Sequence, residues 1–222
     1  KCVFLYQNLL ANQQSYEKSL IDLQFICEAY LKNLLNKKQT VKLGQYIRQT
    51  DEMNKEIGSL IKLVDNRNIN SEVTNLLGMN IKKEFMPSVA NTSQTDLSKY
   101  KIIKKGQFAY SSMQTGRDET IRIALYKFDE PAIISPAYSV FEIIDENQLL
   151  PDFVMMYFLR PESDRFGWFI SDSSVRASLD WDRFCEIKIP VPNIDEQNAI
   201  VSLYQVQEKR KSINIRLKEI IR

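Results

Sequence analysis

The chain contains no histidine among its 222 residues. This absence excludes serine and cysteine nucleophiles that depend on a histidine base, and it excludes histidine-ligated zinc. Only six glycines are present, and no glycine-rich loop of the kinds that bind phosphate can be found. Composition alone therefore disfavours most classes of enzyme, and we expect no catalytic residue and no bound metal.

Cysteine and long apolar runs are also scarce. The three cysteines, Cys2, Cys27 and Cys185, have no metal-ligand spacing and are typical of small apolar residues in a reducing compartment. No apolar run reaches the length of a membrane span, and no signal peptide is visible. We therefore expect a cytoplasmic protein that has no membrane partner.

The net charge of +2 says little about partners, but its distribution says more. Residues 75–127 hold nine lysines and arginines against four acids, whereas residues 128–172 hold two against nine. Two solvated faces of opposite sign would explain this pattern. The more specific interpretation is a basic face that binds the phosphates of a nucleic acid.

Residues 1–37 and 195–222 each have the apolar spacing of a long helix. Alternating steps of three and four residues are typical of a coiled-coil seam, and we expect the two helices to pack antiparallel. In the second helix, Asn193 and Glu196 have the spacing of a capping box at its start. The predicted seam positions are Cys2, Tyr6, Leu9, Gln13, Tyr16, Leu20, Leu23, Cys27, Tyr30 and Leu34, and then Ala199, Leu203, Val206, Arg210, Ile213, Leu217 and Ile220.

Between these helices, residues 38–194 are typical of one mixed domain of short strands and turns. The apolar stretch Pro151–Leu159 predicts a buried helix. The predicted strands are Val41–Arg48, Phe85–Ala90, Tyr100–Tyr110, Ile121–Phe128, Ile134–Ile144 and Phe184–Val191. The fold class is α+β: a mixed α/β domain flanked by two long helices that form an antiparallel coiled coil.

A magnesium-dependent nuclease is one alternative function. Asp152, Glu186 and Lys188 have the residue types that bind Mg²⁺ and activate water in restriction nucleases. Their context is poor, because Asp152 opens an apolar helix and Glu186 and Lys188 simply alternate along a strand. A stalked, dimeric adaptor protein that binds no DNA is a second alternative.

Three polar loops are better candidates for chemistry, and their chemistry is nucleic-acid recognition. Asn, Gln and Arg side chains can read base edges, whereas Ser, Thr and Lys side chains suit phosphate oxygens. Surface loops of any protein carry such residues, so no single one of them indicates nucleic-acid binding. Only the number of these residues supports this interpretation. The candidate DNA-binding residues are Lys82, Lys83, Ser88, Asn91, Thr92, Ser111, Ser112, Gln114, Thr115, Arg117, Ser173, Ser174 and Arg176.

The stretch "SVRASLDWDRFCEIKIPVPNIDEQNAIV", residues 174–201, resembles the end of a recognition domain and the following spacer helix in specificity subunits of type I restriction-modification enzymes. Two prolines there stiffen the chain just before the helix. Further similar segments occur in the same order, so that the resemblance covers residues 38–222. They are "KLGQYIRQ" at 42–49, "LLGMNIKKEFMPSVANTSQTDLSKYKIIKKGQFAY" at 76–110, "IISPAYSVFEII" at 133–144 and "LLPDFVMMYFLRPESDRFGWF" at 149–169.

The resemblance implies a non-catalytic subunit that reads double-stranded DNA. Such subunits carry two target recognition domains, each reading half of a split site, held apart by antiparallel spacer helices. Methyltransferase subunits dock on these helices, and a separate motor-nuclease subunit cuts, so that S-adenosylmethionine, Mg²⁺ and ATP belong to the partners and this chain needs no cofactor. Only one recognition domain is present here. The chain would therefore be the second half of a longer subunit, or a half-size subunit that forms a homodimer through its helices.

Overall fold

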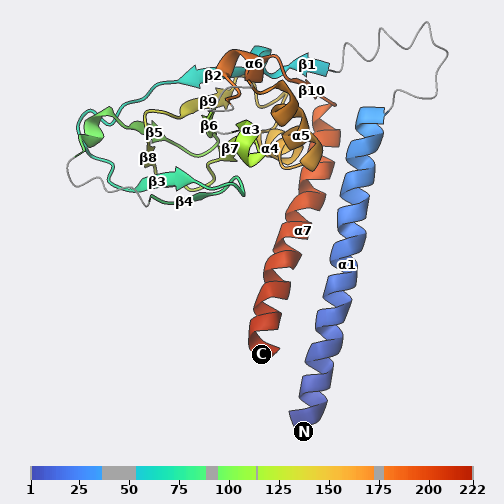
Figure 1. Cartoon of the computed structure of the whole chain (residues 1–222). Helices are drawn as coiled ribbons and strands as arrows, with labels where there is room; N and C mark the ends of the chain where they lie inside the picture. Colours follow the sequence, from blue (N-terminus) through green and yellow to red (C-terminus); the bar gives the residue numbers. More distant parts are fainter. Residues whose placement is uncertain (1, 37–53, 89–94, 114, 173–177, 222) are drawn as a thin grey trace, which may run out of the picture. The chain divides into compact units, whose positions relative to one another are not determined.

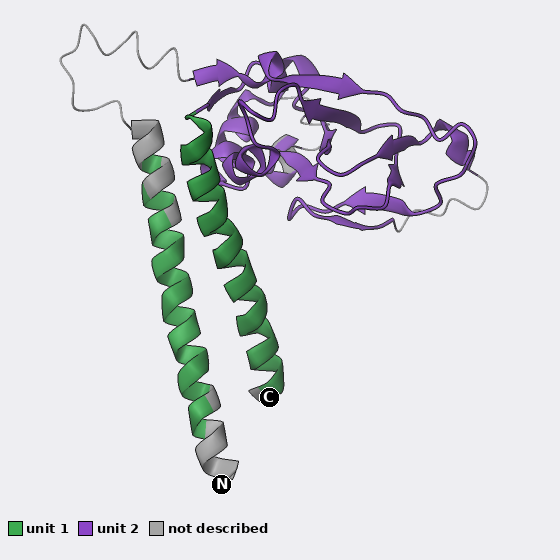
Figure 2. Cartoon of the chain, turned by 180° about the vertical axis from the view of Figure 1, so that it is seen from behind, with its two compact units in different colours: residues 1–51, 192–222 green, residues 52–191 purple. Residues whose placement is uncertain are grey.

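The computed structural model describes residues 2–36, 54–88, 95–113, 115–172 and 178–221. The chain divides into two compact units (Figure 2). Unit 1 comprises Lys1–Asp51 and Pro192–Arg222, and unit 2 comprises Glu52–Val191. The predicted strand over residues 41–48 lies outside the described residues.

Unit 1 is built from two long helices, α1 (Cys2–Asn36) and α7 (Ile194–Ile221). They contact one another and run in opposite directions (Figure 1). The start of α7 is capped as the sequence predicts, since Asn193 Oδ1 accepts a hydrogen bond from the Glu196 amide at 2.9 Å. The carboxylate of Glu17 in α1 lies 2.7 Å from Lys218 Nζ in α7 and also accepts hydrogen bonds from Gln13 and Asn214.

The side chains that the two helices shield from solvent match the predicted seam only in part. In α1, the described seam residues Gln13, Tyr16, Leu20 and Leu23 are all half-buried. In α7, Leu203, Arg210, Ile213 and Leu217 are half-buried as well, but Ala199, Val206 and Ile220 are exposed. The buried residues of α7 are instead Gln197, Ile200, Val201, Gln207 and Asn214. The prediction was wrong at these positions because it chose apolar Val206 over its neighbour Gln207, whereas the helix buries the amide.

Unit 2 contains three small sheets, with every strand pair antiparallel except β3 with β8 (Figure 1). The first sheet pairs β1 (Asn54–Glu56) with β10 (Lys188–Pro190). The second has the order β2 (Ile61–Val64), β9 (Ser139–Ile143), β6 (Phe108–Ser111), β7 (Arg122–Leu125), and the third has the order β4 (Phe85–Pro87), β3 (Leu76–Met79), β8 (Ala132–Ile134), β5 (Lys101–Ile103).

Short helices complete unit 2. They are η1 (Ile57–Ser59), η2 (Leu97–Lys99), α3 (Thr115–Asp118), α4 (Pro151–Phe158), α5 (Pro161–Ile170) and α6 (Trp181–Cys185). The buried helix predicted at 151–159 is confirmed as α4, in which Phe153, Val154, Met155, Met156 and Phe158 are buried. The strand predicted over 184–191 is wrong in its first half, because Phe184 and Cys185 belong to α6.

Aromatic side chains fill the core between the second sheet and the helices. Phe108 stacks on Phe141 with ring centroids 4.9 Å apart, and Tyr110 stacks on Phe184 at 4.2 Å. The Tyr110 hydroxyl donates to the carbonyl of Leu179, so the core reaches the segment that follows residues 173–177. Stacked rings of this kind bury large apolar areas and fix the positions of the loops that leave the sheet.

Candidate nucleic-acid interface

Two of the three predicted reading loops are joined at their bases. The Leu179 amide donates to the Ser112 carbonyl at 2.9 Å, which ties the end of β6 to the segment after residue 178. Residues 172 and 178 are joined as well, because the Asp172 amide donates to the Ser178 carbonyl at 2.8 Å and the Ser178 amide donates to Asp172 Oδ1 at 3.0 Å. The described segments 111–113, 171–172 and 178–179 therefore share one edge of unit 2.

A buried ion pair attaches a third segment to the same region. Lys83, in the turn between β3 and β4, places its Nζ 2.7 Å from Asp164 Oδ1 in the first turn of α5. The same oxygen accepts a hydrogen bond from the Ile121 amide at 2.9 Å, just before β7. Lys83 also donates to the carbonyl of Phe158 at the end of α4. Asp164 therefore connects three segments: the turn at residues 80–84, helix α5, and the residue that precedes β7.

Lys83 does not face solvent, contrary to its expected role as a phosphate anchor. Its residue exposure is 7%, and burial lowers the pKa of its ammonium, although Asp164 partly opposes that shift. Its φ of 64° turns the side chain inward, toward a carboxylate that becomes its neighbour only in the fold. Lys82 is exposed on the same turn and is the lysine available to a phosphate.

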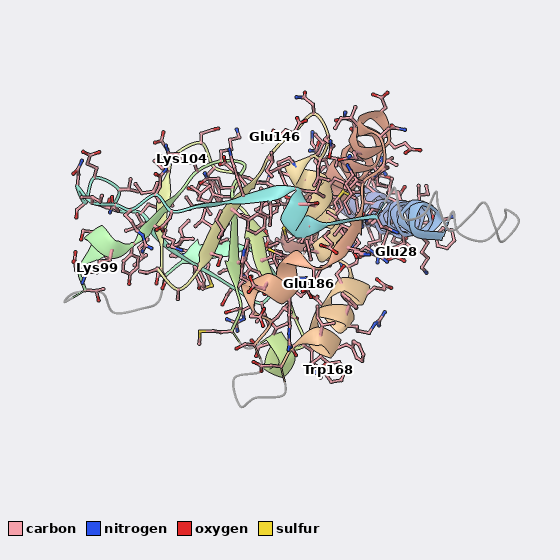
Figure 3. The ribbon with its side chains drawn as sticks, turned by 90° about the horizontal axis from the view of Figure 1, so that it is seen from above. Glu28, Lys99, Lys104, Glu146, Trp168 and Glu186 are labelled. Atoms are coloured by element: carbon pink, nitrogen blue, oxygen red, sulfur yellow. The ribbon has the colours of Figure 1, made fainter. Side chains whose placement is uncertain are left out.

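Close packing of α5 leaves three aromatic side chains on the surface. A Cβ atom added at Gly167 would lie 2.3 Å from Ile121 Cγ1, so this glycine allows α5 to lie tight against Ile121. The side chains on the other face of α5 point toward solvent. Trp168 is 51% exposed and Phe169 is 82% exposed. Figure 3 shows Trp168 beside α3 at one edge of unit 2, and α3 and α5 are in contact.

These aromatic residues are not among the candidates predicted from the sequence. Phe166, also on α5, is 45% exposed, and Arg165 beside it is exposed and lies 3.4 Å from Glu162 Oε1 in an ion pair at the surface. The signal was present in the sequence as "RFGWF", residues 165–169, where a glycine interrupts three aromatic residues. We call Arg165, Phe166, Trp168 and Phe169 the α5 aromatic face. Exposed apolar groups concentrated in this way mark interaction surfaces.

Several predicted contact residues of the 111–118 segment are buried. Ser111 is 6% exposed because it lies within β6, paired with Arg122 of β7. Thr115 is fully buried at the start of α3, and its hydroxyl has no hydrogen-bond partner among the described residues. Ser112 remains half-buried, and Arg117 lies in α3. The side chain of Arg117 and the whole of Gln114 lie outside the described residues.

Ser88 lies apart from the other described candidates. The Ser88 amide donates to the Leu76 carbonyl at 3.1 Å, which places Ser88 at the end of the β3–β4 hairpin opposite the 80–84 turn. Ser88 is therefore separated from Lys82 by the length of β4. Asn91, Thr92, Ser173, Ser174 and Arg176 lie outside the described residues.

The basic segment does not form a broad cationic face, because most of its described charges are paired with acids. Lys105 lies 2.6 Å from Asp129, and Lys127 lies 2.6 Å from Asp152. Further pairs are Lys83–Asp164, Lys99–Asp96, Lys101–Asp65 and Arg122–Asp118. Among the described residues, the structure records no ion pair for Lys82 or Lys104. Figure 3 places Lys104 and Trp168 on opposite sides of unit 2, so Lys82 is the free lysine connected to the α5 edge.

Comparisons with solved structures identify the fold. The S subunit from M. genitalium has 16% sequence identity to this chain and a TM-score of 0.57, and the match covers 99% of this chain and 56% of that one. The HsdS subunit from Thermoanaerobacter tengcongensis has 12% identity and a TM-score of 0.52, with 98% and 53% covered. This is the fold of type I S subunits.

The S-subunit fold accounts for the alternation of helix, mixed unit and helix along this chain. The chain spans about half the length of the two S subunits that it matches. No protein-family model matches the sequence, and no curated protein matches it either. The similarity is therefore one of fold, and identities of 12% and 16% do not identify equivalent residues in the two S subunits.

The surroundings of Asp152 bear on the nuclease alternative, and the helices can also be compared with the thickness of a membrane. Asp152, which was considered as a metal ligand, forms an ion pair with Lys127, and the described part of the chain holds no group of three or more acidic or cysteine side chains that could bind a metal. No described helix of this S-subunit fold is both long enough and apolar enough to cross a bilayer.

Proposed function

We propose that this chain is a non-catalytic subunit that recognises DNA in a type I restriction-modification system and reads one half of a bipartite target. The observation that carries the proposal is the S-subunit fold, shared over 99% of the chain with the M. genitalium protein. A fold does not by itself establish a function, so the reading site must be argued from residues.

The reading edge consists of the segments that Asp164 and the 112–179 contact bring together. Ser112 and Arg117, with Gln114, Ser173, Ser174 and Arg176 nearby in the chain, supply the side-chain types that read base edges in the major groove. Lys82 supplies a phosphate contact from the neighbouring turn. Lys83 is left out of this set because its ammonium is buried and already paired. Ser111 and Thr115 act from within the fold and set the backbone of the loop.

The α5 aromatic face extends this edge. Trp168 and Phe169 contact the duplex, where their rings stack on sugar or partly unstacked bases, and Arg165 contacts a phosphate. Aromatic wedges and stacking platforms of this kind are common among proteins that bind nucleic acid. Support comes from the exposure of both rings and from the contact between α3 and α5.

The two helices of unit 1 act as a spacer in this proposal. As an antiparallel coiled coil they would hold the recognition unit at a fixed distance from a second one, carried by the same longer chain or by another copy. Methyltransferase subunits dock along them and bring S-adenosylmethionine, while a motor-nuclease subunit brings ATP and Mg²⁺ chemistry. Ile21 and Phe25 of α1 are 68% and 71% exposed, which suits a helix that a partner covers.

The test begins with a target sequence obtained by mapping methylated adenines in the host genome with and without the gene. Fluorescence anisotropy of the full chain is then measured with a duplex that carries the target and with a scrambled duplex, at several salt concentrations. We expect tighter binding of the target, with Arg117→Ala and Arg176→Ala each removing about 1–3 kcal/mol of that preference.

Two controls separate the alternatives. No binding to either duplex would favour the adaptor protein that binds no DNA, whereas equal affinity for both duplexes would show DNA binding without recognition of the target. Incubation with plasmid and Mg²⁺ tests the nuclease, for which cleavage by the purified chain would be required. Cleavage would overturn the assignment as a non-catalytic subunit.

A further inference from the structure

Three aromatic rings surround a cavity that lies outside the proposed DNA-reading edge. Tyr126 stands between Phe85 of β4 and Phe128. Its ring centroid lies 5.3 Å from that of Phe85 at an interplanar angle of 86°, and 5.4 Å from that of Phe128 at 62°. These rings, together with Leu77, Met86 and Pro87, line a cavity of about 510 Å³. The Tyr126 ring is steeply inclined to both of its neighbours, so the three rings form a bent wall rather than a flat stack.

Carboxylates complete the lining. Asp129 and Glu130 follow Phe128 directly in the chain and line the same cavity. The Tyr126 hydroxyl donates to the Glu130 carbonyl at 2.5 Å, which fixes the turn that carries both acids. Burial, and then the charge of Glu130, raise the pKa of Tyr126, so its phenol stays neutral. The described residues that line the cavity therefore combine an aromatic wall with two carboxylates and include no basic side chain.

The two carboxylates differ in availability. Asp129 is engaged, since its Oδ1 lies 2.6 Å from Lys105 Nζ, although 85% of its side chain is exposed. For the carboxylate of Glu130 the structure records no ion pair with any described residue, and the residue is exposed. Glu130 is the charge that a ligand could use.

This chemistry selects a cation. The faces of aromatic rings attract ammonium and guanidinium groups, and the carboxylate of Glu130 strengthens that attraction while repelling phosphate. The rim is apolar and open, because Phe128 is 60% exposed and Met86 is 38% exposed. Such a rim covers the methylene stem of a long cationic side chain whose charged end lies inside.

We infer that this cavity binds the side chain of a lysine or arginine presented by a partner protein. The inference goes beyond DNA recognition and does not depend on it, since the residues that line the cavity are not those of the proposed reading edge. The site gives unit 2 a protein contact of its own, apart from the helices of unit 1.

The inference can be tested by NMR on the full chain labelled with ¹⁵N. The probes are N-acetyl-arginine amide and N-acetyl-lysine amide, with N-acetyl-norleucine amide as a matched neutral probe and methylammonium as a cation without a stem. We expect the two cationic amides to shift the amide signals of residues 85–86 and 126–130. Norleucine amide should shift them much less, and methylammonium should bind more weakly than either cationic amide.

Variants assign the effect to the cavity. Phe128→Ala and Glu130→Gln should each weaken binding of the arginine probe roughly threefold or more, as loss of one exposed cation–π or charge contact would. Phe169→Ala is the matched control, because it removes an exposed ring elsewhere on unit 2, and it should leave binding unchanged. Phe128→Ala should also leave DNA affinity unchanged, which separates this test from that of the proposed function.

Several outcomes would overturn the inference. Equal shifts with norleucine amide would show a merely apolar cavity, and equal affinity for methylammonium would show a site for free cations. The absence of shifts at residues 126–130 with either cationic amide would remove the site altogether. An unchanged affinity in Glu130→Gln would remove the electrostatic argument on which the ligand class rests.

Discussion

Lys83 and Asp164 form a buried ion pair across 81 residues of sequence, with Nζ and Oδ1 2.7 Å apart. Only 3% of the lysine side chain and 20% of the aspartate side chain are exposed. Because Asp164 also accepts from the Ile121 amide, one carboxylate determines how the 80–84 turn, α5 and the start of β7 lie together. The proposed reading edge depends on this contact together with the hydrogen bond between Leu179 and Ser112.

Lys83→Met should lower the free energy of unfolding by about 3 kcal/mol, because removal of one partner leaves a largely buried charge uncompensated. The double variant Lys83→Met with Asp164→Asn should recover part of the loss. Urea denaturation measures both. Lys82→Met is the control, since its exposed side chain should contribute less than about 0.5 kcal/mol. Equal effects at the two lysines would contradict the buried pair.

Gly167→Ala should destabilise unit 2 by about 1–3 kcal/mol, because the new methyl group would overlap Ile121 in a tightly packed contact. Ile121→Ala alone creates a cavity and is destabilising as well. In the double variant the added methyl group fills part of that cavity. We therefore expect a combined effect smaller than the sum of the single effects, and strict additivity would show that the two residues do not touch.

Stability should depend on pH through Glu142. The carboxylate accepts a hydrogen bond from Gln107 at 2.8 Å and lies 3.0 Å from Lys62. The Gln107 hydrogen bond first, and Lys62 next, hold the pKa of Glu142 below its ordinary value of 4.5, against the effect of burial. A carboxyl with a lower pKa in the folded state stabilises fully above its unfolded pKa, and this contribution is lost as the pH falls through the folded pKa.

We therefore expect the free energy of unfolding to fall below pH 4.5, and less steeply in Glu142→Gln than in the parent chain. A series of urea denaturation curves between neutral and acid pH measures both slopes. Glu146→Gln is a suitable control, because Glu146 is exposed to solvent at a turn. Parallel curves for all three proteins would show that Glu142 does not contribute.

Trp168→Ala and Phe169→Ala should weaken binding to the target duplex by about 1–3 kcal/mol each, the usual effect of losing a ring stacked on a base. Both side chains are at least half exposed, so the midpoint of urea unfolding should change little. Phe25→Ala, which removes a ring that is 71% exposed on α1, should leave DNA affinity unchanged. Intact affinity in both α5 variants would exclude the α5 aromatic face from the DNA interface.

Lys82→Ala should weaken binding to all duplexes alike and reduce the slope of log affinity against log salt by about one, because one phosphate contact is lost. Lys104→Ala is the matched control, since Lys104 is also exposed and without an ion pair among the described residues but lies across unit 2 from Trp168 (Figure 3). A similar loss in both variants would indicate diffuse electrostatic attraction instead of a local contact.

Elements with a strong local pattern were predictable from the sequence. The apolar run at 151–158 buries five side chains as expected, and Asn193 caps α7. The strand expected over 100–110 is interrupted after Ile103, where Gly106 adopts a φ of 85° and the chain turns between β5 and β6. A single glycine among apolar residues was too weak a signal to place that turn.

The site was less predictable, because it depends on pairings between distant residues. Lys82 and Lys83 are identical neighbours, and only the position of Asp164 decides which one turns inward. The excess of basic residues over 75–127 likewise overestimated the unpaired positive charge of the folded protein. Four of its lysines form ion pairs with aspartates that lie outside this segment: Asp65, Asp129, Asp152 and Asp164. Charge counted along a sequence does not show which charges meet in the fold.

The carboxylate of Glu17 accepts from three side chains at once, Gln13 on its own helix and Asn214 and Lys218 on the other. A slip of α1 along α7 by a single turn, about 5.4 Å, would separate it from both groups on the opposite helix. Intermediate alignments would lose the same contacts and leave these groups to water, because each side chain reaches only a few ångströms. The contacts therefore favour one alignment of the two helices, and a helix lengthened or shortened by a turn would alter any distance that the pair sets by about 5.4 Å.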